Sequence, residues 1–152
     1  MLLYYRAMDV DDLAELAQLI LDAAREIRFH SQLNPQAVML NLSEAKVMTC
    51  IDAQPGVTPS AVAEYTGLQR SNLSTALRVL EERGFVERRV DPHDRRGVNL
   101  FPTALSVENL KLLQQEWART LALGLGDDDS DVEAAKRLLA RLDAGLAAAR
   151  RR

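Results

Sequence analysis

The sequence predicts a mainly α-helical protein with one small β-hairpin, and three patterns support that fold class. Apolar residues recur every three or four positions over most of the chain, which is the spacing of one face of a helix. Two short runs rich in β-branched and aromatic residues, 85–90 and 98–101, are typical of strands. The seven residues between these runs suit the loop of a hairpin.

The segment 58–67 carries both a start signal and a stop signal for a short helix. Thr58 is expected to cap the helix with its hydroxyl group, and Pro59 stands where its missing N–H costs nothing. Gly67 tolerates the left-handed conformation that a sharp turn needs. A first short helix, followed by a tight turn, is therefore predicted here.

A second helix is expected over residues 70–83, with Gly84 ending it. Within it Leu73, Leu77 and Leu80 recur at helical spacing, so these three side chains are expected to face the core. The opposite face carries small polar residues between two arginines, a surface that can lie close to DNA. The residues of this helix that are predicted to contact DNA are Arg70, Ser71, Asn72, Ser74, Thr75 and Arg78.

Ala63, Gly67 and Leu73 have the spacing of a helix-turn-helix, in which a small residue, a glycine and an apolar anchor allow two helices to cross steeply. The same triplet also fits an ordinary helical hairpin. The β-hairpin that follows favours DNA binding, because the adjacent Arg95 and Arg96 at its tip could enter a minor groove, where narrow phosphate walls attract arginine. A salt-bridged surface loop is the other interpretation of that tip.

The run from Leu42 to about Thr103 closely resembles the winged-helix core of the multiple-antibiotic-resistance regulator (MarR) family of bacterial transcription factors. The most specific motifs are L-x-x-x-G-F-V-x-R at Leu80–Arg88 and D-P-x-D-R-R at Asp91–Arg96. The resemblance implies a winged helix-turn-helix whose second helix lies in the major groove. It also implies that Asp94 orients Arg96 in the minor groove. A cleft beside this DNA-binding core is expected to bind a small-molecule effector.

Three positions depart from the usual family pattern. Pro102 precedes Thr103, and Ser106 stands where the family has glycine, so the hinge into the next helix is expected to differ. Because proline has no N–H for a ladder hydrogen bond, the second strand is expected to end before Pro102. Gln69 replaces a Ser-like N-cap, and the first turn of the second helix is expected to be less firmly fixed.

Long amphipathic segments flank the predicted reader (about 42–103), over about residues 8–30 and 104–151. Their apolar stripes need a surface to cover them, and the same helices of a second subunit would provide one in a two-fold homodimer that matches a palindromic DNA site. Packing of the terminal helices on each other within one chain is the alternative. The chain, 1–152, is expected to form one domain. The residues predicted for the dimer seam are Leu13, Leu16, Ile20, Leu139, Leu142 and Leu146.

Charge and composition restrict the classes of function. The net charge is −3, yet residues 66–101 carry seven basic and five acidic side chains, so the positive segment coincides with the predicted reader. No apolar run is long enough to span a membrane and no signal peptide is evident, so a cytoplasmic protein is expected. The single cysteine, Cys50, lies in a predicted helix over 43–53 and is expected to be a buried thiol, with redox sensing as the alternative.

The sequence offers no catalytic or cofactor-binding constellation, since it has no Gly-rich phosphate loop and no paired metal motif. His30 is expected just after the first helix, and zinc sensing there would need further ligands. The acidic run 127–131 is interpreted as a solvated linker rather than a metal site. The aromatic candidates for lining the effector cleft are Phe29, Tyr65 and Trp117.

These observations predict a dimeric, sequence-specific DNA-binding regulator with no metal, no cofactor and no catalytic activity. We expect a repressor that binds a palindromic operator on double-stranded DNA and releases it when a small molecule enters the cleft. The alternative is a helical interaction or oligomerisation protein that keeps the fold without specific DNA binding. A steep dependence of DNA affinity on salt would separate the two.

Overall fold

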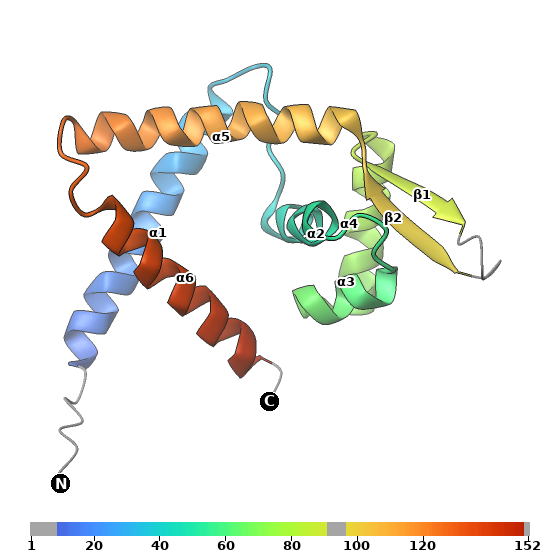
Figure 1. Ribbon diagram of the computed structural model, residues 1–152, viewed down its shortest axis with the longest axis horizontal. Helices are drawn as coiled ribbons and strands as arrows, with labels where there is room; N and C mark the ends of the chain where they lie inside the picture. Colours follow the sequence, from blue (N-terminus) through green and yellow to red (C-terminus); the bar gives the residue numbers. More distant parts are fainter. Residues whose placement is uncertain (1–8, 91–96, 151–152) are drawn as a thin grey trace, which may run out of the picture.

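The computed structural model describes residues 9–90 and 97–150, as a mainly helical protein with one two-stranded antiparallel sheet (Figure 1). The predicted fold class is confirmed. The elements in chain order are α1 (Val10–Gln32), α2 (Leu42–Ala53), α3 (Pro59–Thr66), α4 (Arg70–Glu82), β1 (Val86–Val90), β2 (Val98–Pro102), α5 (Ala104–Leu125) and α6 (Val132–Ala149).

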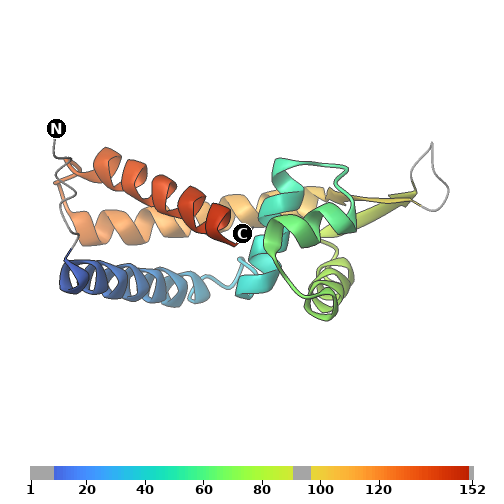
Figure 2. The same cartoon turned by 90° about the horizontal axis from the view of Figure 1, so that it is seen from below.

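Helix α5 connects the two parts of the molecule (Figures 1 and 2). At its N-terminal end lie α2, α3, α4 and the hairpin, which together are called the reader below. At its other end α1 packs against α5, and α6 turns back from the end of α5. The linker of residues 33–41 between α1 and α2 is the second connection between the two parts.

The hydrophobic core lies in the reader. Its fully buried side chains come from different elements, which are thereby held together: Val47 and Ile51 from α2, Val62 from α3, Leu80 from α4 and Leu100 from β2. Burying each of these aliphatic side chains stabilises the fold by about 1.5–3 kcal/mol. The face of α4 that points into this core is therefore fixed, and its opposite face must point outward.

The predicted helix signals of the helix-turn-helix are confirmed. The Thr58 hydroxyl accepts a hydrogen bond from the N–H of Ala61 at 3.3 Å. Gly67 and Gly84 have φ of +67° and +72°, the left-handed region that glycine adopts without strain. Gln69 makes no side-chain capping bond, as its amide side chain led us to expect.

Pro102 is part of β2, so the expectation that the strand ends before it is wrong. The N–H of Leu100 bonds to the carbonyl of Val57 at 2.9 Å, and its carbonyl accepts the N–H of Gly56 at 2.8 Å. Leu100 therefore directs both backbone groups away from β1, and Pro102, two residues further, does the same. The missing N–H of Pro102 removes no hydrogen bond from the hairpin ladder, in which Pro102 pairs with Val86.

Two other expectations concern single residues near the helix ends. Helix α1 continues to Gln32, so His30 lies in its last turn and not after it. In the same turn the hydroxyl of the buried Ser31 donates a hydrogen bond to the carbonyl of Ile27. Cys50 is 2 % exposed, and burial raises the pKa of its thiol, as expected of a core cysteine.

None of the described helices combines the length and hydropathy that a membrane span requires.

Candidate DNA-binding interface

Helix α4 separates its polar face from its apolar face completely. Leu73, Ala76, Leu77 and Leu80 are buried against α2 and the hairpin. The side chains on the outward face supply guanidinium, hydroxyl and amide groups, which are the groups that hydrogen-bond with base edges and phosphates. The six residues predicted from the sequence are all exposed, as is Glu82 at the end of the helix: Arg70, Ser71, Asn72, Ser74, Thr75 and Arg78.

Two arginines on this face differ in their surroundings. Nη1 of Arg78 lies 2.7 Å from Oε1 of Glu82, one turn further along α4, and both side chains are exposed. Arg70, in the first turn, forms no ion pair with any described residue. The positive charge at the N-terminal end of α4 is therefore free to meet a phosphate, whereas that of Arg78 is shared with a carboxylate.

Basic side chains also lie on both faces of β1. Arg88 is paired with Glu81 of α4. The Arg89 guanidinium lies 3.0 Å from Glu87 and 4.4 Å above the centre of the Phe101 ring. Hydrogen bonding and charge from Arg89 hold the pKa of the Glu87 carboxyl below its ordinary value. These contacts order the base of the β1–β2 hairpin, which is called the wing below.

The predicted tip residues Asp94, Arg95 and Arg96 lie outside the described residues. The two strands leading to them are described, and their last pair is Val90 with Val98. The hairpin projects from the reader at the end remote from α1 and α6 (Figure 2).

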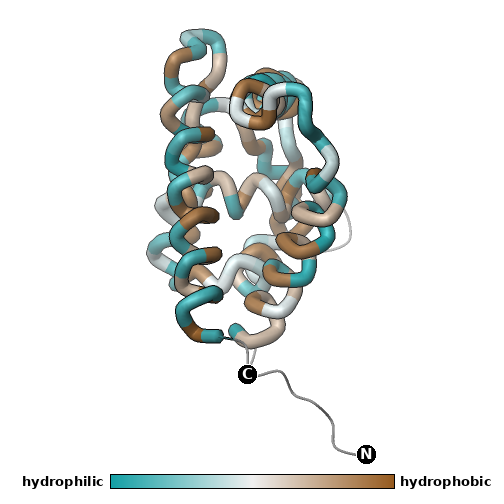
Figure 3. Tube along the Cα trace, turned by 90° about the vertical axis from the view of Figure 1, so that its left-hand side faces the viewer, coloured by the Kyte–Doolittle hydropathy of each residue, from teal (hydrophilic) through white to brown (hydrophobic). Residues whose placement is uncertain are grey.

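The predicted dimer-seam residues lie on faces that a single chain leaves largely uncovered. In Figure 3 hydrophobic residues recur along the terminal helices between hydrophilic ones. Helix α6 contains no buried residue. Leu16 and Ile20 of α1 are half-buried, and the exposed members of the set are Leu13 (42 %), Leu139 (46 %), Leu142 (37 %) and Leu146 (66 %).

A cavity of about 340 Å³ lies between α2 and α5. Trp117 lines it, as the sequence led us to expect, together with apolar residues of both helices and the charged Arg28 and Asp52. Phe29 and Tyr65 do not line it; Tyr65 lines a second cavity, which Asp143 and Ala147 of α6 also line. Phe29 follows Arg28 by about 100° around α1, and its exposed ring packs edge-on against His30; Tyr65 is exposed on α3. The mainly apolar walls suit a small ligand with few polar groups.

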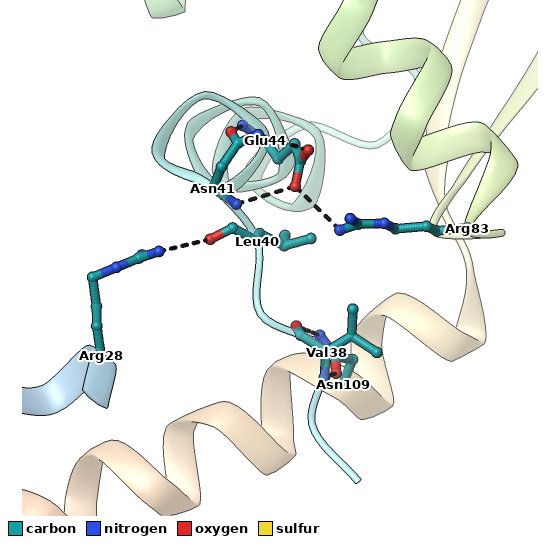
Figure 4. A network of polar contacts seen from close by, with 7 residues as sticks. All are labelled: Arg28, Val38, Leu40, Asn41, Glu44, Arg83 and Asn109. Carbon is teal, nitrogen blue, oxygen red and sulfur yellow. Dashed lines mark hydrogen bonds and ion pairs between the residues drawn. The ribbon is translucent and has the colours of Figure 1, made fainter. Parts of the chain in front are cut away.

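Glu44 is a polar centre that the sequence reasoning missed (Figure 4). Its side chain is buried, and its Oε2 accepts hydrogen bonds from the backbone N–H of Asn41 at 3.1 Å and from Nη1 of Arg83 at 3.2 Å. The Asn41 side chain accepts the N–H of Glu44 in return, at 2.9 Å, which makes a capping box at the start of α2. The N-x-x-E pattern was readable in the sequence. The partner Arg83, which is 39 residues away, was not.

The linker before α2 is held by both neighbouring helices (Figure 4). The Asn109 side chain of α5 accepts the backbone N–H of Val38 at 2.7 Å and donates to the Val38 carbonyl at 3.0 Å. Arg28 of α1 donates to the carbonyl of Leu40 at 3.3 Å. The linker therefore has fixed positions relative to α1, α5 and, through Glu44, the end of α4.

Comparison with known proteins agrees with this geometry. Residues 40–97 match the family model described as "MarR family". An uncharacterized HTH-type transcriptional regulator of Mycobacterium leprae is 27 % identical over 122 residues, which cover 78 % of this chain and 82 % of that protein.

Solved structures extend the likeness to almost the whole chain. The crystal structure of MarR has a TM-score of 0.63 and 28 % identity, over 90 % of this chain and 97 % of that one. Streptococcus pneumoniae FabT, solved in complex with DNA, has a TM-score of 0.66 and 21 % identity, over 91 % and 97 % of the two chains. The family match, the sequence relative and the structural neighbours agree: residues 40–97 match the MarR family, and the chain resembles helix-turn-helix transcriptional regulators over most of its length.

Proposed function

We propose that this protein is a repressor that binds a palindromic operator as a homodimer. The observation that carries the proposal is the separation of faces on α4, which buries four apolar residues and exposes seven polar ones, the six predicted and Glu82. In this arrangement α4 enters the major groove, where Arg70 and Arg78 contact phosphates or guanine and the shorter side chains lie against base edges. The wing residues Asp94, Arg95 and Arg96 contact the adjacent minor groove.

The apolar faces of α1 and α6 support the homodimer. Helix α6 buries none of its residues within the chain, although Leu139, Leu142 and Leu146 recur at helical spacing on it. An apolar helix face in water is unfavourable, and a second copy of the same helices covers it in a two-fold arrangement. Two readers related by that axis then match two half-sites about one helical turn apart. FabT, which has the same fold, was solved in complex with DNA.

The cavity between α2 and α5 supports release by a small molecule. Its walls belong both to the reader, through Met48 and Phe85, and to α5, through Leu113 and Trp117. A ligand that fills it contacts both parts and favours the arrangement of reader and α5 that fits around it. Where that arrangement differs from the DNA-bound one, the ligand releases the operator.

The experiment that tests the proposal measures affinity for duplex DNA at several salt concentrations. An operator is first selected from random duplexes with the full-length protein. Its affinity is then measured at salt concentrations between about 50 and 200 mM. For a protein that makes several phosphate contacts, the affinity falls about 10³-fold or more over this range. We expect a steep loss and a palindromic consensus. Absence of DNA binding at the lowest salt would favour the alternative of a helical interaction protein. Repression itself is measured with a reporter gene under the selected operator.

A further inference from the structure

Glu44 is the one charged side chain that is buried among the residues the structure describes. Removing a carboxylate from water is costly unless the geometry of its partners is good, and an apolar residue at the same place would often be at least as stable. A buried carboxylate that is kept and paired with a more exposed arginine therefore points to a role in fixing one arrangement. Its partner Arg83 is the C-cap residue of the recognition helix α4, and their contact joins the start of α2 to the end of that helix.

The end of α4 is attached to α5 at two points. The first is direct: Thr103, the N-cap of α5, donates its N–H to the Phe85 carbonyl at 3.2 Å and its hydroxyl to the Gly84 carbonyl at 2.6 Å. Helix α4 is also held against α2 by its buried face, yet a single attachment of this kind to α5 allows the reader as a whole to rotate about it. It fixes where the end of α4 lies but does not by itself fix the angle of the helix.

The second attachment runs through the linker. Arg83 binds Glu44, Glu44 binds Asn41, and the linker that leads back from Asn41 is held by Asn109 at the backbone of Val38 (Figure 4). Asn109 lies six residues beyond Thr103, which is about 9 Å further along α5. Two attachments separated in this way hold α4 at one angle to α5, because rotation about the first would break the second.

We propose that the Glu44–Arg83 ion pair is a positioning element that sets the angle of the recognition helix relative to α5. In the homodimer that angle fixes how far apart the two recognition helices lie, and so which half-site spacing the protein accepts. The inference rests on the proposed function for its DNA readout. Glu44 itself is 4 % exposed and contacts no DNA.

The first test measures the choice of half-site spacing. Glu44→Gln keeps a side-chain oxygen for the capping box but removes the charge that pairs with Arg83. We expect it to bind the selected operator about tenfold more weakly and to lose discrimination against an operator with one added central base pair. Glu82→Gln removes the same charge from an exposed pair on α4, and this control is expected to keep the discrimination.

Changes at Arg83 distinguish positioning from a phosphate contact. Arg83→Gln breaks the ion pair by changing its more exposed partner, and it is expected to reproduce the relaxed half-site spacing of Glu44→Gln. The double variant is expected to bind the operator no more weakly than either single variant. Arg83→Lys, which keeps the charge, is expected to retain the parent's spacing preference. The proposal would be overturned if the losses of operator affinity in the two single variants added up in the double variant, and if the slope of log affinity against log salt fell by about 0.9 only when Arg83 is changed. Arg83 would then be a contact to the DNA backbone.

A second test needs no DNA, and so separates failure of this inference from failure of the proposed function. Spin labels are placed at the exposed positions Ser60 in the reader and Lys111 in α5, each changed to cysteine, and the labelled chain is diluted with unlabelled parent protein. The native Cys50 is buried with a raised thiol pKa and stays unlabelled.

The measured quantity is the width of the distance distribution between the two labels. We expect a narrow distribution in the parent and in Glu82→Gln, and a broader or shifted one in Glu44→Gln and Arg83→Gln. Identical distributions in all four proteins, each with an intact melting transition, would show that the ion pair does not set the angle. A protein that binds no operator yet shows the broadening would retain the positioning role and lose only the proposed function.

Discussion

Arg78 and Glu82 form an ion pair on the exposed face of α4, with Nη1 and Oε1 2.7 Å apart and about two thirds of each side chain open to solvent. Such an exposed pair contributes little to stability, on the order of 0.2–1 kcal/mol. Its position matters more, because it places a carboxylate beside an arginine that we assign to the DNA interface. The two residues are therefore expected to act on DNA affinity in opposite directions.

Arg78→Ala is expected to weaken operator binding by about 1–3 kcal/mol, as loss of a base or phosphate contact does. Fluorescence anisotropy with a labelled operator duplex measures the change. The melting temperature is expected to stay close to that of the parent. Equal affinity of variant and parent at every salt concentration would remove Arg78 from the interface.

Glu82→Gln is expected to strengthen binding about threefold, in the range of free energy that an exposed ion pair is worth. The substitution leaves Arg78 without a competing carboxylate and removes a negative charge that faces the phosphates. The same titration measures it, at low salt where screening is weakest. Weaker binding would mean that Glu82 orients Arg78 for its DNA contact rather than competing for it.

A charged residue in the proposed dimer seam is expected to produce monomers. Ile20→Glu and Leu142→Glu each place a carboxylate in an apolar interface, and sedimentation velocity reports the mass. Operator affinity is expected to fall by about 10²–10⁴-fold, because the second half-site is contacted at a high effective concentration only in the dimer. Arg141→Glu, which changes charge on the opposite face of α6, is the control and is expected to remain dimeric.

The wing is tested by Arg96→Ala and Asp94→Ala. Loss of Arg96 is expected to lower operator affinity by about 1–3 kcal/mol, with melting temperature and dimer mass unchanged. Asp94→Ala is expected to have a smaller effect of the same sign, since it frees the arginine without removing it. Tighter binding by Asp94→Ala would indicate that the carboxylate repels phosphates and has no orienting role.

Asp52 is expected to make stability depend on pH. Burial beside the cavity raises the pKa of its carboxyl above the ordinary value of 3.8. A raised pKa in the folded state favours folding at pH values below the unfolded pKa, and that contribution is lost as the pH rises through the folded pKa. Asp52→Asn should therefore melt at a higher temperature than the parent at pH 7.5, and the difference should shrink toward pH 4.5. A constant difference across this range would show that the carboxyl's ionisation is not its cause.

Local signals explain why the helix-turn-helix could be predicted from the sequence. Thr58, Pro59 and Gly67 act on neighbouring backbone groups, so their effects are readable without knowing the fold. The leucines of α4 define its buried face by their spacing alone, which leaves the polar face as the remainder.

Contacts between distant segments could not be predicted in the same way. The pairing of Arg83 with Glu44, and of Asn109 with the Val38 backbone, depends on where the linker crosses α5. The error at Pro102 has a similar origin. Whether a strand tolerates proline depends on the direction in which that residue's nitrogen points, and this followed from the contact of Leu100 with Val57. Phe29 lies away from the cavity between α2 and α5 because its helix face, and not its aromatic character, decides what it contacts.

The outer edge of β2 is closed near its base, and this protects the protein from unwanted association. Val57 occupies the outward hydrogen bonds of Leu100, and Pro102 has no N–H to offer on that side. A strand of another molecule needs a continuous row of free backbone groups to add to a sheet. A strand of another molecule therefore lacks a continuous template for pairing at this end of β2.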